Sequence, residues 1–145
     1  MTDAIAEFEK SLVTPNSKFD KWLKGDDKAL SKQELKGYET FKMKGCVACH
    51  SGPAVGGSMY QKFGLVNAPE YRDQNLGRYA VTKQKADMYV FKVPSLRNIE
   101  LTYPYFHDGR VWSLKKAVKI MGKTQLGVDL SDKEQNDIVA FLKTL

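Results

Sequence analysis

The sequence predicts an all-α domain with long irregular connections, and three observations support this. Four segments carry apolar residues at the three- and four-residue spacing of an amphipathic helix. The capping-box pattern that begins a helix, serine followed three positions later by glutamate, occurs at Ser31 and at Ser131. No segment alternates apolar and polar residues over strand length, so no strand is predicted.

Length and composition exclude several classes of protein. The 145 residues suit one domain, and the 42% hydrophobic and 28% charged residues are typical of a soluble globular protein. No apolar run is long enough to span a membrane. The net charge of +6 comes from basic residues interleaved with acidic ones, without a nucleic-acid motif, so we expect neither membrane nor nucleic-acid binding.

The first predicted helix covers residues 2–12 and ends before Pro15. A polar linker follows over residues 13–30, with Phe19, Trp22 and Leu23 as its predicted apolar anchors. The next helix begins after Ser31 and places Leu35, Tyr38 and Phe41 on one face. This helix leads directly into the pentapeptide CVACH, residues 46–50.

CVACH contains both cysteines of the chain and has four interpretations. A disulfide between Cys46 and Cys49 would close a very small loop and add little stability. A thioredoxin-type redox pair requires a βαβ setting, which the sequence lacks. A zinc site requires four ligands, and only His107 remains as a typical fourth one.

The fourth interpretation is covalent haem attachment, which we favour. In C-x-x-C-H the two thiols add to the two vinyl groups of a porphyrin, and the adjacent histidine binds the iron. Cys46, Cys49 and His50 have this order and spacing. The interpretation also suits residues 51–93, which have no sustained period, because a flat apolar haem would supply the core that so long a loop otherwise lacks.

The C-terminal third returns to helical patterns. Pro94 opens a predicted short turn through Ile99, and residues 113–121 form a helix with Leu114, Ala117, Val118 and Met121 on its apolar face. The last helix follows Ser131, and its apolar face comprises Ile138, Phe141, Leu142 and Leu145.

Two sets of residues resemble a known family. Gly37 and Phe41 before CVACH, with Phe141 in the last helix, resemble class I cytochromes c, in which the first and last helices cross closely at a glycine. A more specific resemblance is to the C-terminal domain of bacterial dihaem cytochrome c peroxidases. The segments that carry it are FEKSLVTPNSKFD (8–20), GCVACHSGPAVGG (45–57), FKVPSLRNIELTYPYFHDGRVWSLKKAVKIMGKTQLG (91–127) and LSDKEQNDIVAFLKTL (130–145).

The resemblance implies electron transfer. In that family an N-terminal haem domain reacts with hydrogen peroxide, and the C-terminal haem accepts electrons from a small donor protein, a cytochrome c or a cupredoxin. We expect this chain to hold one haem c, to relay electrons to such a peroxidatic domain, and to be inactive with peroxide alone. The alternative is a free-standing monohaem cytochrome c that shuttles electrons.

The resemblance also implies a division of the chain. Residues 1–30 would form the interdomain helix and linker of the parent enzyme, and residues 31–145 the haem domain. Thioether attachment takes place in the periplasm, which is the expected location of the parent. Residues 1–12 have no signal-peptide pattern, so we expect an excised domain whose Met1 is not a natural terminus.

The sixth iron ligand is expected to be Met121. Met43 and Met59 lie too close to the motif in sequence, which leaves Met88, Met121 and His107. Met121 ends a helix on its apolar face and falls at the position of the family's axial methionine. The resemblance assigns His107 to the domain boundary.

Three further residues are weaker candidates. Arg97 is suited to bidentate contact with a haem propionate, or it is an ordinary surface residue. Thr102 and Pro104 match family positions whose backbone carbonyls help to hold a calcium ion between the two domains. The remaining calcium ligand would belong to the other domain.

Overall fold

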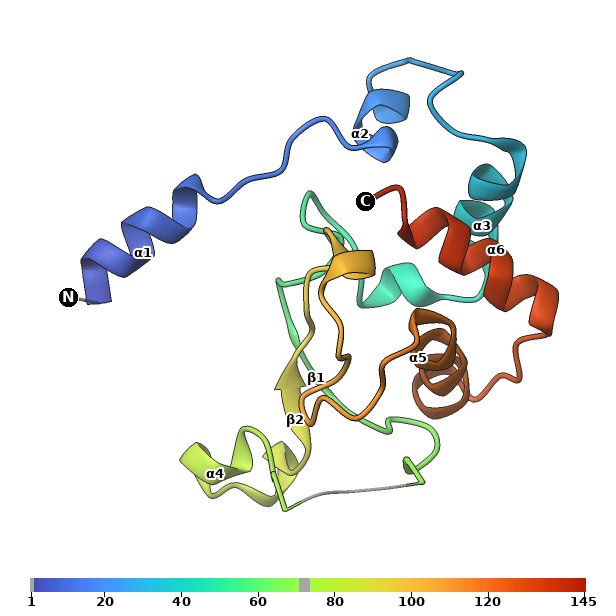
Figure 1. Cartoon of the computed structure of the whole chain (residues 1–145). Helices are drawn as coiled ribbons and strands as arrows, with labels where there is room; N and C mark the ends of the chain where they lie inside the picture. The colour runs from blue at the N-terminus through green and yellow to red at the C-terminus, as the bar shows by residue number, and fades with distance from the viewer. Residues whose placement is uncertain (1, 71–73) are drawn as a thin grey trace.

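The structure is a computed structural model that describes residues 2–70 and 74–145. Within these residues, six α-helices, two short strands and several single turns follow one another (Figure 1). The helices are α1 (Thr2–Ser11), α2 (Lys18–Leu23), α3 (Lys32–Met43), α4 (Tyr79–Thr82), α5 (Leu114–Met121) and α6 (Asp132–Leu142), and the strands are β1 (Tyr60–Lys62) and β2 (Val90–Lys92). The predicted mostly helical class is confirmed.

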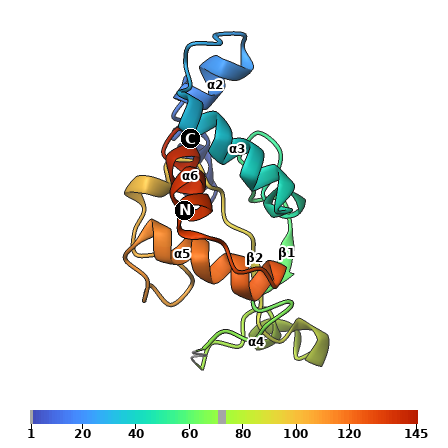
Figure 2. The ribbon, with the colours of Figure 1, turned by 90° about the vertical axis from the view of Figure 1, so that its right-hand side faces the viewer.

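The centre of the fold is the crossing of α3 and α6, which lie side by side in both ribbon views (Figures 1 and 2). Gly37 makes the close approach possible, because a Cβ at this position would lie 1.8 Å from the backbone oxygen of Asp137. It would also lie 2.9 Å from the Cβ of Phe141. The crossing predicted at Gly37 is therefore present in the structure.

An aromatic cluster fills the space around this crossing. Phe141 is only 1% exposed, and its ring centroid lies 5.1–5.3 Å from those of Phe19, Tyr38 and Phe41. The geometries are edge-on or tilted, as aromatic pairs prefer. Each buried phenylalanine contributes roughly 1.5–3 kcal/mol by removal from water, so this cluster is the main apolar core beside the helix crossing.

The helix starts follow the sequence closely. Ser31 and Ser131 each accept a hydrogen bond from the backbone N–H three residues later, and the glutamate at that position bonds back to the serine N–H. Both predicted capping boxes are confirmed. Ser113 caps α5 in a simpler way, by accepting from the Lys116 N–H.

The predicted linker over residues 13–30 contains a helix that we did not predict, α2. Ser17 and Asp20 form a third capping box, with aspartate in place of glutamate. Of the three predicted anchors, Phe19 is buried and Trp22 packs against the core, but Leu23 is 59% exposed. The prediction for Leu23 is wrong because it ends α2 facing the solvent.

The expectation that the chain has no strand is also wrong, because two strands of three residues each are present. Strands β1 and β2 pair antiparallel, with Tyr60 opposite Lys92 and Lys62 opposite Val90. Three residues are too few for alternation to be visible in the sequence. The turn predicted to open at Pro94 is found later, at Ile99–Leu101, after Asn98 in a left-handed conformation.

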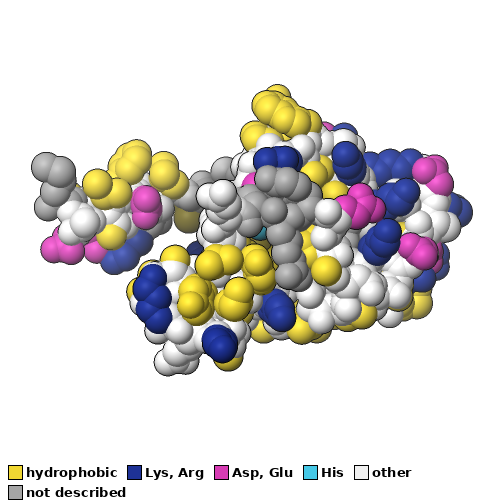
Figure 3. Space-filling model, turned by 90° about the horizontal axis from the view of Figure 1, so that it is seen from below, with side chains coloured by type: hydrophobic (Ala, Val, Ile, Leu, Met, Phe, Trp, Pro, Cys, Tyr) yellow, Lys and Arg dark blue, Asp and Glu magenta, His cyan; other side chains and the backbone are white. Residues whose placement is uncertain are grey.

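Helix α1 projects away from the rest of the chain and buries none of its residues (Figures 1 and 3). Its apolar side chains, including Ile5 and Phe8, are more than half exposed. Within the described residues, no helix is both long enough and apolar enough to cross a membrane.

Candidate functional site

The CVACH motif forms a single tight turn directly after α3. Gly45 has φ +91°, a conformation that glycine adopts without strain, and it redirects the chain at the end of the helix. The backbone N–H groups of Cys49 and His50 then both donate to the oxygen of Cys46, at 3.2 and 3.0 Å. The two cysteines and the histidine are thereby held on one short turn.

Both cysteines are free thiols. Burial raises the pKa of Cys46 to about 11, and the neighbouring Cys49 adds to this effect. A redox-active cysteine needs a lowered pKa, so the environment of Cys46 does not favour a thioredoxin-type pair.

The surroundings of His50 favour its neutral imidazole form. Burial lowers its pKa, and the backbone carbonyls of Val55 and Pro94 offset part of this effect. Its Nδ1 atom is buried and has no hydrogen-bond partner of good geometry. An imidazole without charge is the form that binds a metal ion.

The loop over residues 51–57 encloses this histidine. A Cβ on Gly56 would lie 2.2 Å from the Pro94 oxygen and 3.1 Å from His50 Nδ1, so only glycine fits between them. The segment after β2 supports the loop, because the Gly57 N–H donates to Val93 and the Leu96 N–H donates to Val55. Gly56 was not identified from the sequence.

Val55 marks the strain in this loop. It is buried and has φ +49°, which is unusual for a β-branched residue. Such conformations persist where the surrounding structure fixes them, and they cluster at functional sites.

Arg97, a predicted haem-propionate ligand, contacts three groups of the protein. Its Nη2 lies 2.7 Å from Asp20, its Nη1 donates to the Ser17 hydroxyl at 3.2 Å, and its Nε donates to the Pro53 oxygen at 2.9 Å. Burial raises the pKa of Asp20, but hydrogen bonding and charge from Arg97 outweigh it and hold this pKa below its usual range. These contacts join the start of α2 to the loop beside His50, and the propionate contact stays a prediction.

Met121, the predicted sixth ligand, is the last residue of α5 and is partly buried. The same helix buries Ala117 and Val118, which confirms its predicted apolar face. The chain continues from Met121 into a π-helical turn, Gly122–Leu126, which was not predicted.

The other sulfur and nitrogen candidates lie in different settings. Met43 is 70% exposed, whereas Met59 and Met88 are partly buried in the 51–93 segment. The ring of His107 stacks on Phe91 at 4.0 Å and meets Phe63 edge-on at 5.5 Å. This aromatic packing is consistent with a structural role for His107.

Thr102 and Pro104, the predicted calcium positions, lie on an exposed segment between two apolar side chains that face solvent, Leu101 and Trp112. Within residues 2–70 and 74–145, no three His, Cys, Asp or Glu side chains group as a metal site requires. The calcium site therefore stays a proposal.

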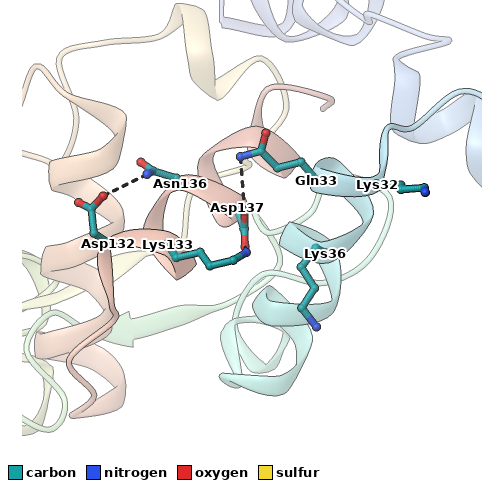
Figure 4. A pocket seen from close by; sticks show the side chains of 7 residues that line it. All are labelled: Lys32, Gln33, Lys36, Asp132, Lys133, Asn136 and Asp137. Carbon is teal, nitrogen blue, oxygen red and sulfur yellow. Dashed lines mark hydrogen bonds and ion pairs between the residues drawn. The ribbon is translucent and has the colours of Figure 1, made fainter.

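The open groove between α3 and α6 is a separate feature from this turn. It has a volume of about 710 Å³ and is lined by Lys32, Gln33, Lys36, Asp132, Lys133, Asn136 and Asp137 (Figure 4). Lys133 and Gln33 both bond to Asp137, and Asn136 bonds to Asp132. Its polar groups are thus largely paired with one another, which does not favour a ligand site.

The residues of the turn fit a covalently bound haem. Two cysteine thiols, a partly buried histidine and a glycine-lined loop around it could supply the attachment points and one ligand for the haem iron.

Comparisons with known proteins agree with this fit. Residues 35–145 match the family model described as cytochrome c, and residues 1–28 match the model described as di-haem cytochrome c peroxidase. Over its whole length the chain is 59% identical to cytochrome c551 peroxidase of Nitrosomonas europaea and 51% identical to cytochrome c551 peroxidase of Pseudomonas aeruginosa. It spans 43% of each of these relatives, which is their C-terminal part.

A solved structure is also similar in fold. The crystal structure of a MauG-like protein associated with microbial copper homeostasis superposes with a TM-score of 0.84 at 27% identity. The match covers 98% of this chain and 51% of that one.

Proposed function

This chain belongs to the cytochrome c family, and from this premise we propose that it serves electron transfer as the C-terminal cytochrome c domain of a bacterial cytochrome c peroxidase. Cys46 and Cys49 would attach one haem c, and His50 and Met121 would supply the two protein ligands of its iron. The observation that carries the proposal is the CVACH turn, which holds Cys46, Cys49 and the partly buried His50 together on one short turn. When bound, haem c supplies a one-electron couple between ferric and ferrous iron.

The residues of the chain set the properties of that couple. The soft thioether of Met121 favours ferrous iron, so a His/Met pair gives a higher reduction potential than a His/His pair. Thioether bonds to Cys46 and Cys49 would hold the group at the turn that follows α3. The 51–57 loop fixes the position of His50 through its backbone contacts.

The place of this step in the whole enzyme is part of the proposal. The domain accepts electrons from a small donor protein, a cytochrome c or a cupredoxin, and relays them to an N-terminal peroxidatic haem domain. The match of residues 1–28 to the di-haem peroxidase model supports this over a free-standing electron shuttle. The parent is proposed to work in the periplasm, with Thr102 and Pro104 contributing carbonyls to an interdomain calcium ion.

The test is the absorption spectrum of the haem-loaded chain in both redox states. Ferric protein with Met121 on the iron should show the weak long-wavelength band of methionine-to-iron charge transfer. Met121→Ala should abolish this band and leave an iron that binds added ligands. Met88→Ala is the matched control, and loss of the band in that variant instead would reassign the ligand.

Peroxide turnover gives a second test of the relay role. With Met121 as an iron ligand, no position would be left for peroxide, and a single haem would exchange only one electron. The chain alone should therefore oxidise a reduced donor at a negligible rate when peroxide is added. Turnover near that of a two-haem enzyme would contradict the proposal.

A further inference from the structure

The helix that ends at Met121 does not stop in the ordinary way. Residues 122–126 form a π-helical turn, a rare conformation that is frequent at functional sites. Gly122 and Thr124 are buried in this turn, and the Gly122 oxygen accepts from both Gly127 and Val128. The wider turn leaves carbonyls at positions 123 and 124 that need partners from elsewhere in the chain.

Residues 62–67 supply those partners. The oxygen of Thr124 accepts from the N–H groups of Val66 and Asn67, at 3.0 and 3.1 Å. The side-chain amide of Asn67 donates to the Lys123 oxygen at 2.8 Å. In Figure 1 this segment continues from β1 and passes below α5, so the π turn rests on a separate part of the fold.

Gln125 completes this junction with its side chain. Its Oε1 accepts from the N–H groups of Gly64 and Leu65, at 2.6 and 3.1 Å. Its Nε2 donates to the Lys62 oxygen at 3.1 Å. Both acceptor sites of the amide oxygen are used, so one side chain bonds to three backbone groups of the 62–65 segment, those of Lys62, Gly64 and Leu65.

We propose that Gln125 is a positioning residue that holds Met121 in place for iron binding, by fastening the π turn to residues 62–65. The inference rests on the proposed His50/Met121 ligation. Gln125 acts through the backbone, because it lies four residues after Met121 and bonds to the 62–65 segment. Without it, the end of α5 and the thioether it carries gain freedom to move away from the iron.

The experiment measures how easily methionine is displaced in the ferric, haem-loaded full chain. Imidazole is added while the long-wavelength methionine band is followed. Gln125→Met keeps the side-chain volume and removes all three hydrogen bonds. Imidazole should therefore displace Met121 at about one tenth of the concentration that the parent chain requires. The far-ultraviolet circular dichroism, which reports helix content, should match that of the parent chain.

Two further variants distinguish the loss of the Gln125 hydrogen bonds from a change in side-chain size. Gln125→Glu keeps both acceptor sites for Gly64 and Leu65 but loses the donor to the Lys62 oxygen, so its imidazole affinity should lie between those of the parent and Gln125→Met. Gln125→Asn has the same chemistry but is one methylene shorter and cannot reach, so it should resemble Gln125→Met. The asparagine variant also decides the question if the methionine variant does not load haem. Gln84→Met, at an exposed glutamine, is the matched control and should show no change.

The outcomes distinguish this inference from the proposed function. A parent chain without the band, or a Met121→Ala variant that keeps it, overturns the ligation itself. The ligation stands if the parent chain shows the band and Met121→Ala loses it. If Gln125→Met or Gln125→Asn then has the imidazole affinity of the parent, only the role of Gln125 is overturned.

Discussion

At position 37 a single hydrogen atom decides how closely α3 and α6 can approach. Alanine is a better helix former than glycine by about 1 kcal/mol, so propensity alone predicts that Gly37→Ala stabilises the chain. The added Cβ would lie 1.8 Å from the Asp137 oxygen, and backbone on both sides would have to shift. We expect the free energy of unfolding to fall by about 2–3 kcal/mol, measured by denaturant titration.

The control for this change is Glu39→Ala, on the solvent side of the same helix. It should alter the free energy of unfolding by less than about 0.5 kcal/mol. If Gly37→Ala proved as stable as the parent, the helices would not cross at the observed distance.

At the residue scale, Arg97 has two candidate partners, Asp20 and a haem propionate. If its role is structural, Arg97→Met should lower the free energy of unfolding by about 1–3 kcal/mol, because it leaves Asp20 partly buried and unpaired. Asp20→Asn should then add little in the double variant. If a haem propionate is the partner, the reduction potential should change and the two mutations should act independently.

Arg78→Met provides the comparison for Arg97. Arg78 is 48% exposed and lies 3.4 Å from Asp87, so its loss should cost less than about 1 kcal/mol. Equal effects at positions 78 and 97 would argue against a special role for Arg97 in the fold.

Whether the sequence alone reveals the role of a residue depends on how far its partners lie from it along the chain. Cys46, Cys49 and His50 act within five positions, so their spacing alone indicates the chemistry. Ser17 and Arg97 are 80 positions apart, and Gly64 and Gln125 are 61 apart. No local pattern links such pairs, and without the fold each appears as an ordinary polar residue.

At the scale of elements, one ion pair joins the end of α3 to the start of α6. Lys44 lies 2.7 Å from Glu134, which is also the capping-box glutamate of Ser131. The hydrogen bond from Lys44, together with those from Ser131, lowers the pKa of Glu134 to about 2. The pair therefore stabilises the fold above pH 4.5, the ordinary pKa, and this contribution disappears as the pH falls toward 2.

Glu134→Gln should reduce the loss of stability between pH 4.5 and 2, and should cost about 1 kcal/mol or less at neutral pH because the pair is partly exposed. Thermal unfolding of parent and variant across this pH range provides the measurement. Glu9→Gln on α1, where nothing packs, should leave the profile unchanged. A parental pH profile in Glu134→Gln would mean that other carboxylates dominate.

The elements that could be predicted were those with long periodic faces and clear caps. Helices α3, α5 and α6 begin at the expected serines, and their apolar faces are the buried ones. The six residues of α2 and the three of each strand are too short to show a period. The π turn was missed because its partners come from residues 62–67 rather than from its own sequence.

At the scale of the whole molecule, α1 is the part that contributes least to the fold. None of its residues is buried, so deletion of residues 2–12 should change the free energy of unfolding by less than about 0.5 kcal/mol. Extending the deletion through Phe19 and Asp20 should be strongly destabilising, because it removes a core side chain and the partner of Arg97. A large loss from the short deletion would show that α1 packs on the body in solution.

The crossing of α3 and α6 also has a consequence for the order of folding. Gln33 and Asp137 meet across it although they lie 104 positions apart, so their contact closes nearly the whole chain into one loop. Closing so long a loop costs entropy before any native contact compensates for it, which makes this pairing a slow step. Cys46 and Cys49 lie within this loop, close to its N-terminal end. A prosthetic group attached early would therefore sit on a chain that is not yet folded, and it would be enclosed only when α6 packs against α3.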